Sequence, residues 1–299
     1  MKENPLFSDF DPAFFQNNHY STSELEKMII SSQIASMRER ASGKYDLILA
    51  AVSFFPTLNV SYHFGRMVDD IADGDAPLPG CFSGFEEFVD NLKNRALQPE
   101  NSDKVKCAAE FLLLRSVDRL NRISKNQQEV LEGVNWFLNS MLEENRRRVD
   151  RKVLTKRQLE KVHYNSFGSS LEISLIAIGS NNRAKDIPEA PLILGKDYSI
   201  EEKELKPDLK RGICNIPSEV LSTANLTLEH LMKNPDLVSH PKIQEWIINE
   251  EIEVGEILDK VKGRKLDTRS DLLVNRFMLL GVRKRHFEKK HLSGRRINV

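Results

Sequence analysis

The chain has 299 residues, 40% of them hydrophobic, and carries 44 basic and 44 acidic side chains. Its length and apolar content suffice for a sizeable core, and its formal net charge of zero gives no support to a nucleic-acid partner. The three cysteines are widely spaced and odd in number, which argues against a disulfide framework and favours a reducing compartment.

Residues 1–20 contain two prolines and are expected to form an extended N-terminal arm. The arm lacks a basic start and an apolar centre, so it does not resemble a signal peptide, and no uncharged apolar run is long enough to span a membrane. We therefore expect a cytoplasmic protein. The basic tail, residues 291–299, leaves a peripheral membrane contact open, and the run Arg146-Arg147-Arg148 is expected at the surface. The sequence specifies no oligomeric state.

Residues 21–290 have the pattern of one all-α domain. The capping box Ser21-Thr22-Ser23-Glu24 predicts a helix that runs toward Arg40. Apolar residues spaced three and four apart predict further helices, with the expected ranges 45–55, 57–73, 82–97, 103–123, 126–149, 155–179, 218–233, 241–261 and 268–287. Loops are expected at 74–80 and 179–191, where prolines and glycines gather, and no segment has the alternation of a strand.

The helix expected at 57–73 carries three carboxylates within five residues, those of Asp69, Asp70 and Asp73. Asp69 and Asp73 are one turn apart on one helical face, and like charges at this spacing repel unless they hold a cation. Mg2+ prefers oxygen ligands and commonly binds through one or two carboxylates and the phosphates of a substrate. Arg66 lies one turn before Asp70, where its planar guanidinium could bind phosphate oxygens.

A solvated acidic helix end is the alternative for this stretch, although apolar residues on several sides favour carboxylates that face a core or cavity. The motif Tyr62-x-x-x-Arg66-x-x-Asp69-Asp70-x-x-Asp73 resembles the first aspartate-rich motif of the squalene and phytoene synthases. The resemblance implies a single-domain, isoprenoid-synthase-like helical bundle around a central cavity. It also implies that Mg2+ joins the three aspartates to a prenyl diphosphate.

The resemblance suggests further substrate-binding and catalytic residues. A serine and an aromatic residue that contact diphosphate in the family correspond most closely to Ser42 and Tyr45, and Tyr62 and Arg66 are the substrate-binding candidates within the motif. Tyr164, which a run of small residues follows, matches a tyrosine that faces the reaction centre in squalene synthases. It is the catalytic candidate beside Arg66, and a structural core tyrosine is the open alternative.

A second acidic cluster has spacings of four, three and four, which would place all its members on one face of a helix: Asp197, Glu201, Glu204 and Asp208. The residues from Asp208 onward, Asp-Leu-Lys-Arg-Gly-Ile-Cys-Asn-Ile-Pro, resemble the end of the second aspartate-rich motif of the family. The resemblance implies that Glu204 and Asp208 bind metal and that Asp197, Glu201 and Arg211 bind substrate.

This second cluster departs from the family pattern. Glu204 stands where the family has an aspartate, Lys203 where it has an arginine, and Ile200 where it has a metal-binding asparagine. Pro207 lies inside the expected helix, where it would remove a hydrogen bond and clash with the preceding turn. The segment is therefore expected to have a reshaped helix, or to be a charged helix exposed to water.

We expect a Mg2+-dependent prenyltransferase that ionises a prenyl diphosphate, such as farnesyl or geranylgeranyl diphosphate, and joins it to a second prenyl unit. Other readings remain open. An enzyme of the same fold could use one prenyl diphosphate, either transferring it to a non-prenyl acceptor or cyclising it, and the altered second cluster favours this reading. A non-catalytic assembly or binding protein and a Mg2+-dependent diphosphohydrolase also fit.

Overall fold

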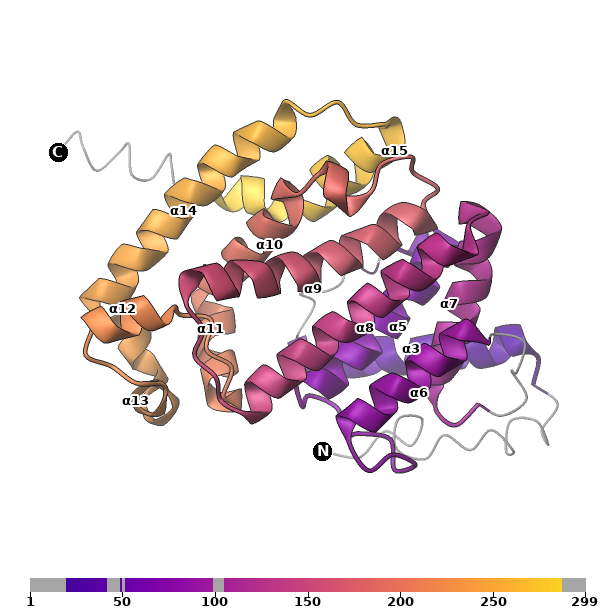
Figure 1. Ribbon diagram of the computed structural model, residues 1–299, viewed down its shortest axis with the longest axis horizontal. Helices are drawn as coiled ribbons and strands as arrows, with labels where there is room; N and C mark the ends of the chain where they lie inside the picture. The colour runs from indigo at the N-terminus through magenta and orange to yellow at the C-terminus, as the bar shows by residue number, and fades with distance from the viewer. Residues whose placement is uncertain (1–19, 42–48, 50–51, 99–104, 287–299) are drawn as a thin grey trace. The chain divides into compact units, whose positions relative to one another are not determined.

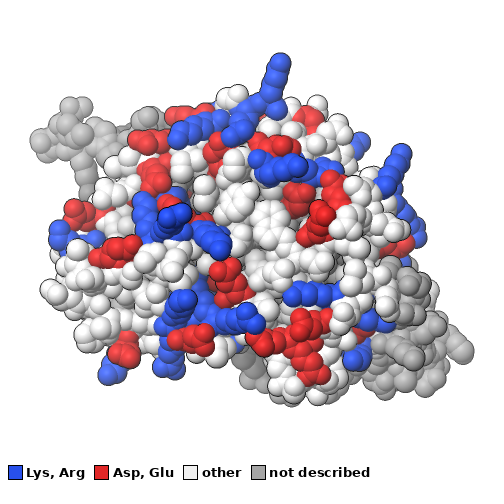
Figure 2. Space-filling view, in the orientation of Figure 1, with Lys and Arg blue, Asp and Glu red and all other residues white. Residues whose placement is uncertain are grey.

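A computed structural model describes residues 20–41, 49, 52–98 and 105–286 of the chain (Figure 1). These residues form helices joined by turns and loops, and none of them is in a strand, which confirms the expected all-α class. No helix in the described ranges is both long and apolar enough to cross a membrane. All three cysteines are free: Cys81 is exposed, and Cys107 and Cys214 are buried. Basic and acidic side chains are interspersed on the face drawn in Figure 2.

The chain divides into two compact units. Unit 1 comprises Met1–Asn145 and Glu172–Gly179, and unit 2 comprises Arg146–Leu171 and Ser180–Val299. The assignment of residues 21–290 to a single domain stays a prediction.

Unit 1 contains most of the N-terminal helices. They are α3 (Thr22–Ala41), α5 (Pro56–Ala72), α6 (Phe85–Leu97), α7 (Ala108–Ser124) and residues 127–145 of α8 (Gln127–Val149). Helix α7 packs against α5 and α6, and α3 packs against α5. Glu26 of α3 accepts hydrogen bonds from Arg115 and Arg119 of α7, which ties these two helices together. Ser21 and Glu24 form the expected capping box of α3.

Helix α5 follows closely the range expected for the acidic motif. Pro56 occupies its first turn, where the missing N–H is not needed and the fixed φ suits a helix. The helix ends at Asp73, whose N–H donates to the carbonyl of Asp69, and Gly74 follows with a φ of 78°. Glycine adopts this left-handed backbone conformation without steric strain, so the position of Gly74 in the sequence specifies where the helix stops.

Unit 2 contains the C-terminal helices. They are residues 156–171 of α9 (Lys156–Ala177), η2 (Ala184–Asp186), α10 (Glu189–Ile200), α11 (Glu202–Arg211), α12 (Ser218–Thr223), α13 (Leu228–Lys233), η3 (Pro235–Ser239), α14 (Pro241–Lys262), α15 (Thr268–Asp271) and the π-helix η4 (Leu272–Met278). The long helix α14 packs along α10 and against α12 and η3, and α11 packs against α10, α13 and η3 (Figure 1). Leu209, Ile216 and Ile243 are among the buried residues of this core.

Several expected boundaries in unit 2 are wrong. The helix expected at 218–233 is two helices, because Asn225 adopts a left-handed φ of 55° that asparagine tolerates, and Thr227 then caps α13. The loop expected at 179–191 contains η2 and the start of α10. The range 268–287 begins with the short helix α15 and continues as a π-helix instead of one α-helix.

In unit 1, α6 and α7 begin later than expected, at Phe85 and Ala108. The apolar segment expected at 45–55 falls partly outside the described residues.

Candidate active site

The aspartate-rich motif occupies the last two turns of α5, in unit 1. Nη1 of Arg66 lies 2.6 Å from Oδ2 of Asp69, and Nη2 of Arg66 lies 2.5 Å from Oδ1 of Asp70. The side chain of Asp70 is fully buried, whereas that of Asp69 is 33% exposed. One guanidinium therefore bridges two neighbouring carboxylates, one directed into the unit and one within reach of solvent.

Opposing effects act on the ionisation of Asp69 at this helix end, and those that favour its protonated form are the stronger. Partial burial raises the pKa of Asp69 above its ordinary value, and the charges of Asp70 and Glu144 act in the same direction, while Arg66 opposes the rise. A divalent cation would reverse this balance, because it stabilises the ionised carboxylate. Binding of a cation at Asp69 is thus expected to release protons in slightly acidic solution.

The C-terminal end of α5 is held in place by backbone contacts. Nδ2 of Asn145 donates to the carbonyl of Ala72 over 2.9 Å, and the amide of Ala76 donates to the carbonyl of Asp70 over 2.9 Å. Asp73 is half-buried and follows the last helical residue. These bonds fix the backbone from which Asp69 and Asp73 project, one turn apart.

Tyr62 begins the motif and is half-buried on α5. Its ring stands edge-on to that of His63, with 5.4 Å between the ring centroids. His63 is buried and its Nδ1 lies 2.6 Å from Oε1 of Gln33 in α3. Burial lowers the pKa of His63 to about 4, so the imidazole beside Tyr62 is uncharged at neutral pH.

Two of the three aspartates at this helix end are suitable ligands for Mg2+. Among the described residues, no group of three or more histidine, cysteine or acidic side chains is arranged to hold one metal ion. Mg2+ does not require such a group, because it keeps several waters and binds substrate phosphates. Asp69 and Asp73, both within reach of solvent, are the pair that fits it, whereas buried Asp70 is held by Arg66.

The second acidic cluster lies in unit 2, and its helix is not continuous. Helix α10 ends at Ile200, and Glu201 has an extended backbone with a ψ of 114° before α11 begins at Glu202. The expectation that four acidic residues share the face of one helix is therefore wrong. Asp197 and Glu201 both form ion pairs with Arg285, and the contact to Glu201 measures 2.9 Å. Glu204 is half-buried on α11.

Asp208 is buried and both its oxygens accept hydrogen bonds. Arg211 donates to Oδ1 over 2.5 Å, and Asn215 donates to Oδ2 over 2.9 Å. Burial raises the pKa of Asp208 to about 6, although Arg211 favours its ionised form. Gly212 ends α11 with a left-handed φ of 86°, which lets the chain turn back so that Asn215 reaches Asp208.

Arg147 belongs to this network and was not among the sequence candidates. It donates to the carbonyl of Cys214 over 2.9 Å and to Oδ1 of Asn215. Its burial contradicts the expectation that the whole arginine run faces solvent. Three adjacent helical residues span about 200° around the helix axis, so in a helix packed against a core one of three adjacent arginines tends to face inward, and this periodicity was the signal available.

The last candidates from the sequence are Tyr164 and the two residues expected to contact diphosphate before α5. Tyr164 is half-buried on α9, in unit 2. In the small-residue run that follows it, the hydroxyls of Ser169 and Ser170 donate to the carbonyl of Ser166. The two predicted diphosphate contacts before α5 lie outside the described residues; they are Ser42 and Tyr45.

Comparisons with protein-family models, curated proteins and solved structures gave no match. The resemblance to the squalene and phytoene synthases therefore rests on the motif residues themselves.

The helix end of α5 has the chemical means to bind a metal-bound diphosphate. Carboxylates at one-turn spacing supply oxygen ligands, and a guanidinium beside them supplies hydrogen-bond donors for phosphate oxygens. In the second acidic cluster, Asp197 and Glu201 pair with Arg285, and Asp208 pairs with Arg211. The first motif is thus the stronger candidate for metal binding.

Proposed function

We propose that the chain is a Mg2+-dependent prenyltransferase of the squalene/phytoene synthase type. In this proposal it ionises a prenyl diphosphate, such as farnesyl or geranylgeranyl diphosphate, and joins the prenyl cation to a second prenyl unit. The observation that carries the proposal is the end of α5, where Arg66 contacts two of the three motif carboxylates in a helix with a largely buried surface.

The proposed roles of the residues follow from their positions on α5. Asp69 and Asp73 would hold Mg2+, which neutralises the charge of the departing diphosphate when it is bound. Arg66 would turn part of its guanidinium from Asp69 to the diphosphate oxygens, where positive charge stabilises the leaving group. Asp70 would keep the other end of that guanidinium in place, because their contact is the more deeply buried of the two.

A second candidate is an enzyme of the same type that uses one prenyl diphosphate. The contacts of the second acidic cluster favour it, because a metal ion there would have to displace Arg285 from Asp197 and Glu201, or Arg211 and Asn215 from Asp208. Such an enzyme would pass the prenyl cation to a non-prenyl acceptor or cyclise it, and would need only the motif of α5.

The two candidates differ in their products. Purified protein should be incubated with Mg2+ and either prenyl diphosphate, and both released pyrophosphate and the organic extract should be analysed. A hydrocarbon with twice the carbon number of the substrate would establish condensation of two prenyl units. Pyrophosphate release with a product of the original carbon number, or release that requires an added acceptor, would establish the one-substrate reaction.

Absence of pyrophosphate release with every prenyl diphosphate and acceptor would overturn both candidates and favour an assembly or binding protein. A matched pair of variants connects any activity to the motif. Asp73→Asn should abolish release, whereas Asp90→Asn, the same chemical change on an exposed residue of α6, should leave it unchanged.

A further inference from the structure

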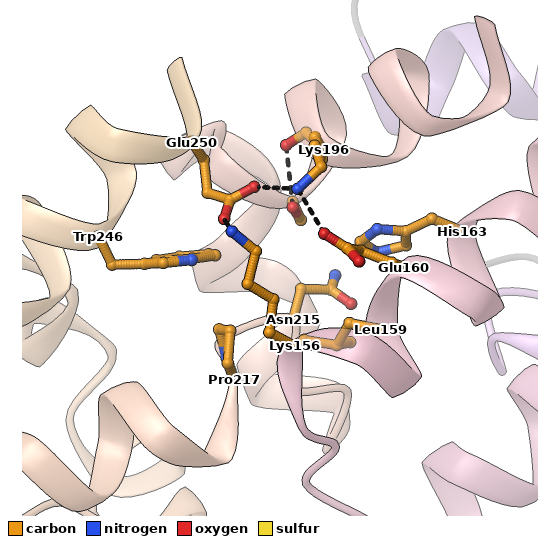
Figure 3. Close-up of a pocket in the computed structure, with 10 residues that line it drawn as sticks. Lys156, Leu159, Glu160, His163, Lys196, Asn215, Pro217, Trp246 and Glu250 are labelled. Carbon is orange, nitrogen blue, oxygen red and sulfur yellow. Dashed lines mark hydrogen bonds and ion pairs between the residues drawn. The ribbon is translucent and has the colours of Figure 1, made fainter. Parts of the chain in front are cut away.

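Unit 2 contains a pocket that none of the predicted metal- or substrate-binding residues lines (Figure 3). Its walls come from α9, α10 and α14 and from the turn before α12. The side chains that matter for its chemistry are those of Lys156, Glu160, His163, Lys196, Trp246 and Glu250. The pocket is therefore a separate feature of unit 2, and what it binds does not depend on the proposed prenyltransferase activity.

The charged groups of the pocket are paired with one another. Nζ of the buried Lys196 lies 2.9 Å from Oε1 of Glu160 and 2.7 Å from Oε2 of Glu250. Nζ of Lys156 lies 2.9 Å from Oε1 of Glu250. Glu253, which does not line the pocket, forms ion pairs with both lysines. Each lining charge thus has an opposite partner, and the pocket presents no unpaired charge that would favour an ion.

Two buried polar groups at the pocket lack partners among the described residues. The two ring nitrogens of His163 and the indole nitrogen of Trp246 have no hydrogen bond, although His163 is only 6% exposed and Trp246 only 8%. A buried donor or acceptor without a partner keeps the full cost of its lost hydration. Buried polar groups in folded proteins are therefore bonded to protein or to a bound molecule.

The imidazole of His163 is held in a fixed place and is uncharged. Burial lowers its pKa to about 3, and the positive charges of Arg147 and Lys196 act in the same direction. Gly195 of α10 packs so closely on it that a Cβ there would lie 2.2 Å from Cβ of His163. In Figure 3 the ring points from α9 toward the other lining residues, beside Glu160.

In a neutral imidazole one nitrogen donates a hydrogen bond and the other accepts one. A hydroxyl group can accept from the first or donate to the second, whichever nitrogen faces the pocket, whereas an anion can only accept and a metal cation can only take a lone pair. The space left in the pocket is about 10 Å3, which is close to what a single water molecule requires. We propose that the pocket binds an uncharged, water-sized hydroxyl group that is hydrogen-bonded to the imidazole of His163.

Water and a small alcohol share this chemistry, and NMR on the full chain with ring-labelled histidine can tell them apart. The His163 ring signals are assigned by their loss in His163→Phe. At neutral pH we expect one tautomer, with a ring N–H slow enough in exchange to give a cross-peak to water. If titrated methanol replaces this cross-peak with one to its methyl protons and shifts the ring signals saturably, the site accepts alcohols as well. If methanol has no effect, the occupant is water.

The proposal fails if His163 is a mixture of rapidly exchanging tautomers, if its N–H shows no cross-peak to water or methanol, or if the ring is protonated at neutral pH. His230, exposed on α13, is the internal control and should give no cross-peak to bound water. Gly195→Ala provides a test from the opposite helix. The added methyl group should displace the ring and remove the cross-peak, while the signals of unit 1 stay unchanged.

Discussion

Replacing Asp70 by asparagine should destabilise unit 1 far more than the same replacement of Asp73. The Asp70 side chain is fully buried and lies 2.5 Å from Arg66, whose side chain is 19% exposed. Breaking a buried ion pair by removing one partner costs about 3–5 kcal/mol, because the other charge stays buried. Arg66 keeps Asp69 at 2.6 Å, so we expect a smaller loss, about 2–3 kcal/mol.

The chain has two tryptophans, and each lies in a different unit, which allows unit 1 to be followed alone. In a Trp246→Phe background, the fluorescence of Trp136 reports urea unfolding of unit 1. With an m-value of about 2 kcal/mol per molar urea, the midpoint should fall by about 1 M in Asp70→Asn. Asp73→Asn should change stability by less than about 0.5 kcal/mol. Equal midpoints for the two variants would refute the assignment of Asp70 as a buried anchor.

Three further predictions follow from unit 2. The pKa of Asp208 is raised to about 6 in the folded state, so its contribution to stability is present below about pH 4 and is lost as the pH rises through 6. Asp208→Asn should flatten this pH dependence when the free energy of unfolding is measured across that range, and an unchanged profile would contradict the prediction. Arg285→Gln should cost only about 1 kcal/mol in urea unfolding, because the arginine that joins Asp197 and Glu201 is 38% exposed, and a much larger loss would show a structural role. Tyr164→Phe should alter the rate or the product pattern while the unfolding midpoint stays nearly constant; an unfolded variant would instead show that the hydroxyl supports the core.

The acidic helix of unit 1 is predictable because its determinants are local. Pro56 suits its first turn, apolar residues spaced three and four apart define its buried side, and Gly74 permits the left-handed turn that ends it. The same holds for the capping box at Ser21 and Glu24. The sequence also placed Arg66 one turn from Asp70, and their contact is what that spacing allows.

The second cluster could not be predicted in the same way. Regular spacing shows only that acidic residues would share a face if the helix were continuous, and α10 ends before Glu201. The partner of Asp197 is Arg285, 88 residues later, and no local pattern indicates such a contact. Pro207 did signal an irregular helix, but the break lies upstream of it, and Pro207 itself is inside α11.

The buried network around Asp208 escaped prediction because its members look unremarkable in sequence. In the sequence, Asn215 is one uncharged residue of the segment that follows Asp208, and Arg147 is one of three adjacent basic residues. Their roles depend on the turn at Gly212, which brings Asn215 to within 2.9 Å of Asp208.

The most direct test of the central claim is the rate of pyrophosphate release from a prenyl diphosphate by the wild-type chain and by Asp69→Asn and Asp73→Asn, each with Mg2+ and with a chelator. We predict Mg2+-dependent release by the wild type, none above background by either variant, and an unfolding midpoint for Asp73→Asn that matches the wild type. Release by both variants at the wild-type rate, or release by the wild type that survives the chelator, would contradict a metal-bound diphosphate at the end of α5.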